Sequence, residues 1–291
     1  MIAFLSEYGM FLAKVVTLVV AILFVIGGIA ATASRGRNKA GQDGELRVRH
    51  LNEEFDDLKD SLEAEILPEA QRKKAHKAKR KQEKLEAKQK KKAGTEDKVE
   101  PRLFVLDFDG DVQASAVDHL RREISAVLQV ATQNDEVLVR LQSPGGLVHS
   151  YGLAASQLRR IRNSGIKLTV TVDEVAASGG YMMACIADRI VAAPFAVIGS
   201  IGVVAQIPNF HRLLKKNDID VELMTAGEYK RTMTMLGENT EKGRAKFQEE
   251  LEETHQLFKT FVRDNRRGLD LDKVATGEHW FGSQAKELGL V

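Results

Sequence analysis

The residues best suited to chemistry are a serine and the two glycines after it, in the stretch VAASGGYMMA at residues 175–184. A β-type apolar run at 168–172 precedes this stretch and small residues at helical spacing follow, so Ser178 is predicted at a strand-to-helix turn. Glycines there let backbone approach a substrate, and N–H groups at a helix start stabilise a developing negative charge. The pattern is typical of a serine nucleophile, although a serine in that place can also simply cap the helix.

A serine nucleophile needs a base that removes its proton. None of the seven histidines can be placed against Ser178 from the sequence, although catalytic triads are defined in space. Lysine is the remaining option, and it acts as a base only when desolvation lowers its pKa. Lys230, in the segment 226–232, is ordinarily expected to be a solvated surface charge.

Metal and thiol chemistry receive little support from the sequence. There is no His-Glu-x-x-His or paired-cysteine pattern, so we expect no metal ion, and nothing indicates a cofactor. The single cysteine, Cys185, rules out an intrachain disulfide and fits best as a small buried residue. A hydrophobic content of 43% is enough for a sizeable core and excludes a disordered protein.

The elements that would hold Ser178 in place lie after residue 101. Apolar runs and helical spacings alternate there, which indicates an α/β fold with a parallel sheet. In such sheets, functional sites gather where strands end and helices begin. The expected strands cover residues 102–107, 136–141, 167–172, 188–193 and 221–224, and the expected helices cover 114–130, 151–161, 209–216, 240–265 and 283–288.

A glycine-rich turn, Ser143-Pro-Gly-Gly146, follows the second expected strand as Ser178 follows the third. Gly145 and Gly146 can therefore present N–H groups at the edge where Ser178 lies. A purely structural turn would also favour these residues.

The N-terminal region carries a 19-residue stretch without charge, at residues 15–33, which is long enough to span a bilayer. We interpret it as a retained anchor, because it exceeds a usual signal-peptide core and only Lys14 gives the preceding residues a positive charge. Basic residues follow directly and favour a cytoplasmic location for the rest of the chain. They are Arg35, Arg37 and Lys39.

We expect four segments along the chain. A tail at 1–14 precedes the anchor at 15–33, and a connector at 34–101 joins the anchor to the folded domain at 102–291. Apolar residues at helical spacing predict an amphipathic helix at 51–66, which either self-associates or lies on the main domain. Residues 72–92 then hold 12 Lys or Arg against two acids. This run lacks aromatic residues and a folded recognition module, so we do not expect a nucleic-acid partner. We expect a solvated helix or tether with a secondary attraction to anionic lipid.

The chain carries four motifs in this order: Ser143-Pro-Gly-Gly146, Val175-Ala-Ala-Ser-Gly-Gly-Tyr181, Gly199-Ser-Ile-Gly202 and Tyr229-Lys230. Taken together, they resemble the signal peptide peptidase A family of serine peptidases. The resemblance covers residues 103–291 and the N-terminal layout, and it is closest to the single-domain, membrane-anchored members. It implies stacked ββα units in a superhelix, as in the Clp protease proteolytic subunit and the crotonases, behind a single transmembrane helix.

The resemblance also implies roles for individual residues. Ser178 would be the nucleophile, Lys230 its general base, and Ser200 a hydrogen-bond partner that orients the lysine. The oxyanion hole would combine the N–H of Gly179 with that of Gly145 or Gly146. It implies short apolar or signal-peptide-like substrates, no cofactor, and a homo-oligomer in which Lys230 can serve the Ser178 of a neighbouring copy.

Several alternatives remain open at this stage. The chain could be a non-catalytic oligomeric scaffold of the same fold, or a crotonase that acts on acyl-CoA thioesters at the same glycine-lined turns. The chain is expected in the bacterial inner membrane. The basic residues after the anchor favour the cytoplasmic side for the folded domain, whereas the clearing of signal peptides by relatives is associated with the outer face of this membrane. Relatives usually continue past Gly289-Leu-Val291, so we expect either missing C-terminal elements or a fragment.

Overall fold

The computed structural model describes residues 14–17, 46–68, 71–72, 77, 81, 84–85 and 100–291. Residues up to 79 and residues from 80 onward form two separate units. No helix within the described ranges combines the length and apolar character needed to cross a bilayer. The predicted anchor lies outside the described residues apart from positions 15–17, as do the tail before Lys14 and most of the basic run.

The predicted helix of the first unit is confirmed as α2, Leu51–Ile66. Glu53 and Glu54 lie in its first turn, where negative charge is favourable, and the helix ends before Pro68. None of its residues is buried within this unit. Self-association through its apolar face and packing on the main domain therefore both stay predictions.

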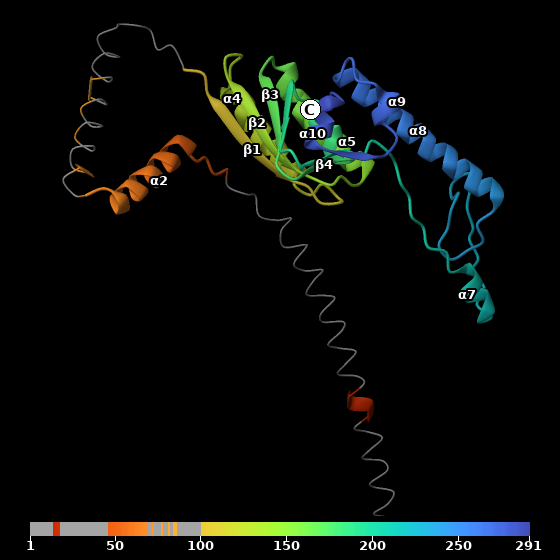
Figure 1. Cartoon of the computed structure of the whole chain (residues 1–291). Coiled ribbons are helices and arrows are strands. Elements are labelled where there is room, and N and C mark those ends of the chain that lie inside the picture. The colour runs from red at the N-terminus through yellow and green to blue at the C-terminus, as the bar shows by residue number, and fades with distance from the viewer. Residues whose placement is uncertain are drawn as a thin grey trace, which may run out of the picture. The chain divides into compact units, whose positions relative to one another are not determined.

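The second unit is built on a parallel sheet in the order β1-β2-β3-β5, which confirms the predicted α/β class (Figure 1). In register, Leu106, Val139, Val170 and Ile190 form a row of buried side chains across all four strands. The helices α4 and α5 contact each other and strands β1 and β3, so they cover this apolar face. The elements are β1 (Leu103–Asp109), α4 (Val117–Val130), β2 (Glu136–Gln142), α5 (Val148–Asn163), β3 (Lys167–Val172) and β5 (Arg189–Ala192).

A second, smaller sheet carries the Ser178 region. β4 (Val175–Ala177) pairs in parallel with β6 (Val197–Gly199), and β6 pairs antiparallel with β7 (His279–Phe281). A β-bridge between Ser143 and Ala176 joins the end of β2 to β4. The predicted strand 167–172 therefore does not lead directly into Ser178, because β4 intervenes before α6 (Gly179–Ala184).

A segment at residues 203–240, here called the arm, extends from the second unit. It contains α7 (His211–Lys216) and leads into the long helix α8 (Glu241–Asn265), whose start is capped by the Thr240 hydroxyl. Figure 1 shows α7 beyond the end of α8 that lies away from the sheet. The predicted strand at 221–224 is wrong, because this exposed part of the arm pairs with no other strand in the described chain.

The C-terminal end of α8 packs against the core, and the elements after it complete the domain. Phe258 and Val262 are the buried residues of α8, whereas the neighbouring Leu257 is 71% exposed. Two short helices follow, α9 (Leu271–Val274) and α10 (Gly282–Glu287). Helix α8 thus meets the core only over its last turns.

Acid should weaken the fold through Asp135, a buried carboxylate before β2. It accepts hydrogen bonds from the backbone N–H and guanidinium of Arg102 (2.8 and 2.9 Å) and from the N–H and hydroxyl of Thr132 (2.7 and 3.0 Å). These bonds, led by the one from the Arg102 side chain, hold the pKa of Asp135 well below its usual range.

We therefore expect Asp135→Asn to lower the melting temperature at neutral pH, with a difference from wild type that shrinks in acid. The unfolded chain binds this proton more tightly than the folded protein does, so the stabilisation is full above about pH 4 and is lost below it. Thermal melts at a series of pH values measure the difference. A gap that stays constant down to about pH 2.5 would contradict this assignment.

Candidate active site

Ser178 has a strained backbone conformation between β4 and α6. Its φ is 52° and its ψ is −118°, values that a non-glycine residue adopts only where the surrounding structure enforces them. The Ser178 N–H donates to the carbonyl of Gly199 at 2.8 Å, and Met182 N–H donates to the Ser178 carbonyl at 2.9 Å. The side chain makes no capping hydrogen bond with the helix, so capping does not explain this serine.

The two glycine turns meet at Ser178. Gly145 has a φ of 90°, and a Cβ placed on it would lie 2.7 Å from the Cβ of Ser178 and 2.6 Å from the backbone nitrogen of Gly179. A Cβ on Gly146 would lie 2.1 Å from the carbonyl oxygen of Val112. Only glycine permits these approaches, so the structure brings Gly145, Gly146, Ser178 and Gly179 into one place.

The backbone N–H groups of this cluster differ in what they bind. Gly145 N–H donates to the Ser143 hydroxyl at 3.1 Å, and Leu147 N–H donates to the Val112 carbonyl at 2.8 Å. Within the described chain, no acceptor takes the N–H of Gly146 or that of Gly179, the first residue of α6. Two N–H groups beside Ser178 are therefore available to a ligand.

Ser200 lies next to Ser178 because of the register between β4 and β6. Ala177 pairs with Gly199, and each is followed by a serine with positive φ, 52° at Ser178 and 50° at Ser200. Ser200 N–H donates to the carbonyl of Glu278 at 2.7 Å. The two serines thus follow paired residues at the same edge of the small sheet.

Lys230 is the one predicted site residue that a single chain does not bring to Ser178. It is exposed, and the turn that carries it lies beside the first turns of α8, because Lys242 pairs with Glu228 and Lys246 Nζ lies 5.8 Å from the Tyr229 ring. Further along α8, His255 Nε2 lies 3.1 Å from the carbonyl of Ile201, next to Ser200.

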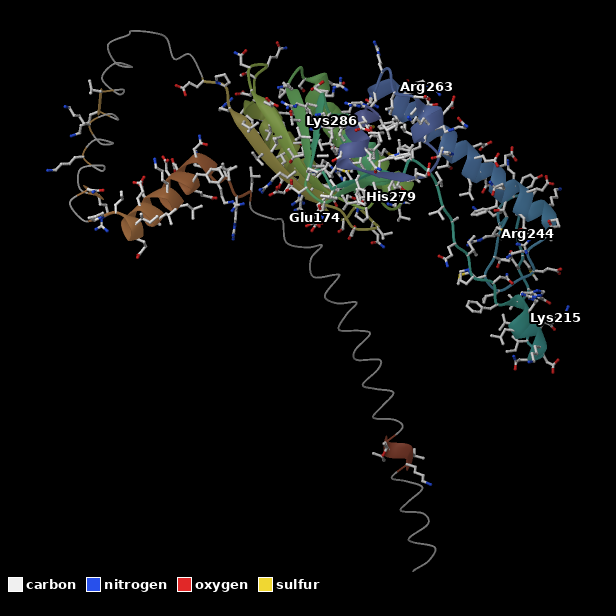
Figure 2. The ribbon with its side chains drawn as sticks, in the orientation of Figure 1. Glu174, Lys215, Arg244, Arg263, His279 and Lys286 are labelled. Carbon is white, nitrogen blue, oxygen red and sulfur yellow. The ribbon has the colours of Figure 1, made fainter. Side chains whose placement is uncertain are left out.

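The length of α8 separates these two contacts. His255 lies nine positions after Lys246, which corresponds to about 13 Å along the helix. Figure 2 shows Arg244 and Arg263 near opposite ends of α8, with Lys215 beyond Arg244. Within one copy, the lysine turn thus lies at the far end of α8 from the serines.

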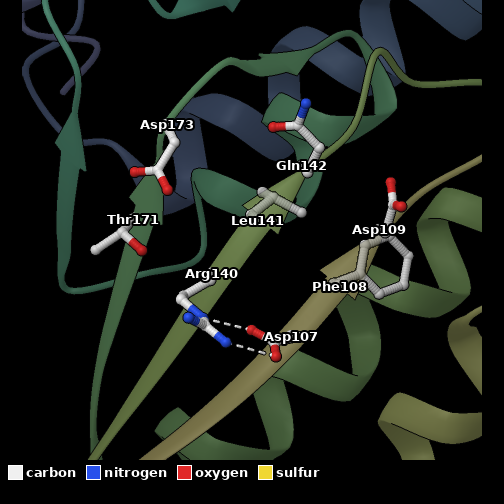
Figure 3. A pocket seen from close by; sticks show the side chains of 8 residues that line it. All are labelled: Asp107, Phe108, Asp109, Arg140, Leu141, Gln142, Thr171 and Asp173. Carbon is white, nitrogen blue, oxygen red and sulfur yellow. Dashed lines mark hydrogen bonds and ion pairs between the residues drawn. The ribbon is translucent and has the colours of Figure 1, made fainter. Parts of the chain in front are cut away.

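A pocket of about 250 Å³ lies at the carboxyl ends of β1, β2 and β3, on the side opposite α4 and α5 (Figure 3). Asp109, Gln142 and Asp173 line its upper part, and the paired Asp107 and Arg140 lie below them. The hydrogen bond to Asp107 raises the pKa of the Arg140 guanidinium. Despite these carboxylates, no group of three or more His, Cys, Asp or Glu among the described residues could hold a metal ion.

Cys185 is not a competing nucleophile. It is fully buried, and desolvation raises the pKa of its thiol to about 12. A thiol that stays protonated at neutral pH does not attack a carbonyl, so the reading of Cys185 as a small core residue is confirmed.

Comparison with known proteins identifies the class. The model for the N-terminal part of peptidase family S49 matches residues 3–158, and the model for peptidase family S49 matches residues 160–291. The chain therefore belongs to peptidase family S49.

Individual relatives agree with this assignment. A protein described as probable protease SohB from Haemophilus influenzae is 58% identical over 296 residues, which cover 99% of this chain and 82% of that protein. A probable protease SohB from Buchnera aphidicola subsp. Schlechtendalia chinensis is 48% identical over 293 residues, 99% of this chain and 95% of that protein. Protease 4 of H. influenzae is 27% identical over 192 residues, 64% of this chain and 30% of that protein. The chain is thus a SohB-type peptidase, a hydrolase similar to these bacterial proteins.

Proposed function

We propose that the protein is a serine endopeptidase in which Ser178 is the nucleophile and Lys230 of a neighbouring copy is the general base. The observation that carries the proposal is the environment of Ser178. Its backbone is held in a strained conformation, its side chain is not used to cap α6, and two unbonded N–H groups lie beside it. This combination is typical of a nucleophile that faces an oxyanion hole.

In the proposed reaction, the neutral amine of Lys230 takes the proton of the Ser178 hydroxyl while the oxygen attacks the scissile carbonyl carbon. The C–N bond then breaks, and the lysine returns the proton to the leaving amine. Water then attacks the acyl carbon while the same lysine takes its proton, the ester C–O bond breaks, and the lysine returns the proton to the Ser178 oxygen. Ser200 would hold the amine in position through a hydrogen bond.

The negative charge on the carbonyl oxygen would be held by Gly179 N–H and by one glycine of the preceding turn. Gly146 is favoured over Gly145 for this second donor, because Gly145 N–H already donates to the Ser143 hydroxyl. Each donor of such a pair typically contributes about 10²–10³ to turnover.

A base contributed by a neighbouring copy follows from the position of Lys230. The turn that carries Lys230 lies at the opposite end of α8 from the serines, so a single copy does not bring its amine to the Ser178 hydroxyl. Docking of the arm against another copy would remove water from the amine and also bring it to a Ser178. The proposal therefore includes a homo-oligomer.

The substrates we propose are short apolar peptides such as those left in membranes after signal-peptide cleavage. The uncharged run at residues 15–33 supports a membrane anchor, and hence a place in the bacterial inner membrane beside such peptides. The parallel α/β core also supports a fold like that of the Clp protease subunit.

Cleavage of an internally quenched apolar peptide by the detergent-solubilised protein tests the proposal. We expect Ser178→Ala and Lys230→Ala to lose at least about 10³ in kcat/KM, because each removes a partner in proton transfer and attack. The matched controls are Ser164→Ala and Lys215→Ala. Ser164 is an exposed serine directly after α5, and Lys215 is an exposed lysine of the arm. Undiminished cleavage by either site variant removes that residue from the mechanism.

A further inference from the structure

A buried chain of hydrogen bonds lies beneath the turn that holds Gly145 and Gly146. Tyr151, in the first turn of α5, and Ser143 are both fully buried. The phenolic oxygen of Tyr151 lies 2.6 Å from the Ser143 hydroxyl and 2.7 Å from the carbonyl oxygen of Asp111. The Ser143 hydroxyl in turn lies 3.1 Å from the backbone nitrogen of Gly145.

The direction of every bond in this chain is determined by its two ends. The Asp111 carbonyl can only accept, so Tyr151 donates its proton there. The Ser143 hydroxyl must then donate to the Tyr151 oxygen, and it accepts the N–H of Gly145. Burial raises the pKa of Tyr151, so the phenol stays protonated and keeps this arrangement.

The ring of Tyr151 supports the other side of the site. A Cβ on Gly179 would lie 2.3 Å from Cγ of Tyr151, so the backbone at the start of α6 rests directly on the ring. Phe108 packs edge-on against the same ring, with 6.5 Å between the centroids. One side chain therefore contacts Gly179 and, through Ser143, also holds Gly145.

The peptide bond between Gly145 and Gly146 is held from both sides by these contacts. Gly145 N–H is bound by Ser143, and Leu147 N–H is bound by the carbonyl of Val112 at 2.8 Å. Without the first bond, the freedom of glycine at a φ of 90° would let the intervening peptide plane rotate. Rotation would move the Gly146 N–H out of the position that the proposed oxyanion hole requires.

We infer that Tyr151 is the positioning residue of the oxyanion hole, fixing Gly146 N–H through Ser143 and Gly179 N–H through its ring. The inference rests on the proposed function. Tyr151 is not a catalytic residue, since the hydrogen bonds of its hydroxyl are used up within the buried chain and none reaches the substrate.

The test is the steady-state kinetics of Tyr151→Phe, which keeps the ring and removes the hydroxyl. We expect kcat to fall by about 10- to 100-fold with KM within about twofold, because a misplaced donor weakens binding of the transition state only. Ser143→Ala should give a similar loss from the other end of the chain, and the double variant should lose little more than either alone. The affinity of a peptide aldehyde, whose adduct with Ser178 carries an oxyanion, should fall by the same factor as kcat.

Thr169→Val is the matched control, because it removes a buried hydroxyl bonded to Glu136 at 2.6 Å near the amino ends of β2 and β3. It should lose stability but keep its kcat. If Tyr151→Phe fails to fold, the kinetics of Ser143→Ala decide. An unchanged kcat in a folded variant, a change in KM alone, or fully additive losses would overturn the inference while Ser178→Ala stays inactive. Full activity in Ser178→Ala would instead remove the proposed function, and this inference with it.

Discussion

Mixing Ser178→Ala subunits with Lys230→Ala subunits should restore peptide cleavage that neither variant shows alone. In a mixed oligomer, the intact lysine of one variant meets the intact serine of the other. For random assembly at equal amounts, half of the serines and half of the lysines are intact, so about a quarter of wild-type turnover is expected. The physical reason is the position of Lys230, exposed on the arm at the far end of α8 from Ser178.

Co-expression with two different affinity tags, followed by purification through both, gives the mixed oligomer for this measurement. The control pairs Ser178→Ala subunits with the Ser178→Ala/Lys230→Ala double variant, which leaves no intact serine and should stay inactive. No recovery in a mixed oligomer of verified composition would show that the dyad forms within one copy. The arm would then have to fold back along α8 before catalysis.

Replacing Gly145 with alanine should abolish activity while leaving a folded protein. The added Cβ would lie 2.7 Å from the Ser178 Cβ and 2.6 Å from the Gly179 nitrogen, so it would push apart the two segments that hold the proposed oxyanion donors. Alanine at a φ of 90° also adds strain of about 1–2 kcal/mol. We expect kcat to fall by at least about 10³, more than for loss of a single donor.

Gly152→Ala makes the same chemical change where it should do no harm. Gly152 lies inside α5, and a Cβ there meets nothing within 4 Å. Because alanine favours helix over glycine, this variant should gain about 0.5–1 kcal/mol in stability and keep wild-type turnover. Circular dichroism melts and initial rates of both variants make the comparison. Near-normal kcat in Gly145→Ala would show that the turn does not hold the oxyanion site.

The parallel core could be predicted from the sequence because its signals are local and repeated. The bounds of β3 agree with the prediction to the residue, since an apolar strand pattern at 167–172 follows the turn glycine Gly165. The predicted strand at 221–224 is wrong for the opposite reason. Its apolar residues lie on the exposed arm with no partner strand, and strand propensity is realised only against a neighbour.

The details of the site depend on pairings that no local pattern reveals. β4 has only three residues and exists because it pairs with β6, more than twenty positions later. That register puts Ser200 beside Ser178, which the sequence suggested only through a family resemblance. The chain of hydrogen bonds from Gly145 to Asp111 runs through the buried Tyr151, which lies forty positions after Asp111 in the sequence. Sequence reasoning missed this chain of hydrogen bonds.

Under the proposed function, the distance of Lys230 from the Ser178 of its own copy has a consequence for the timing of proteolysis. A newly synthesised copy would carry a nucleophile without a competent base, and would be harmless to the proteins around it. Hydrolysis would begin only after a copy has bound another copy. Dilution would therefore lower the peptidase activity without any inhibitor or removable propeptide. If the arm docks on a neighbouring copy as proposed, the same segment would also prevent premature digestion.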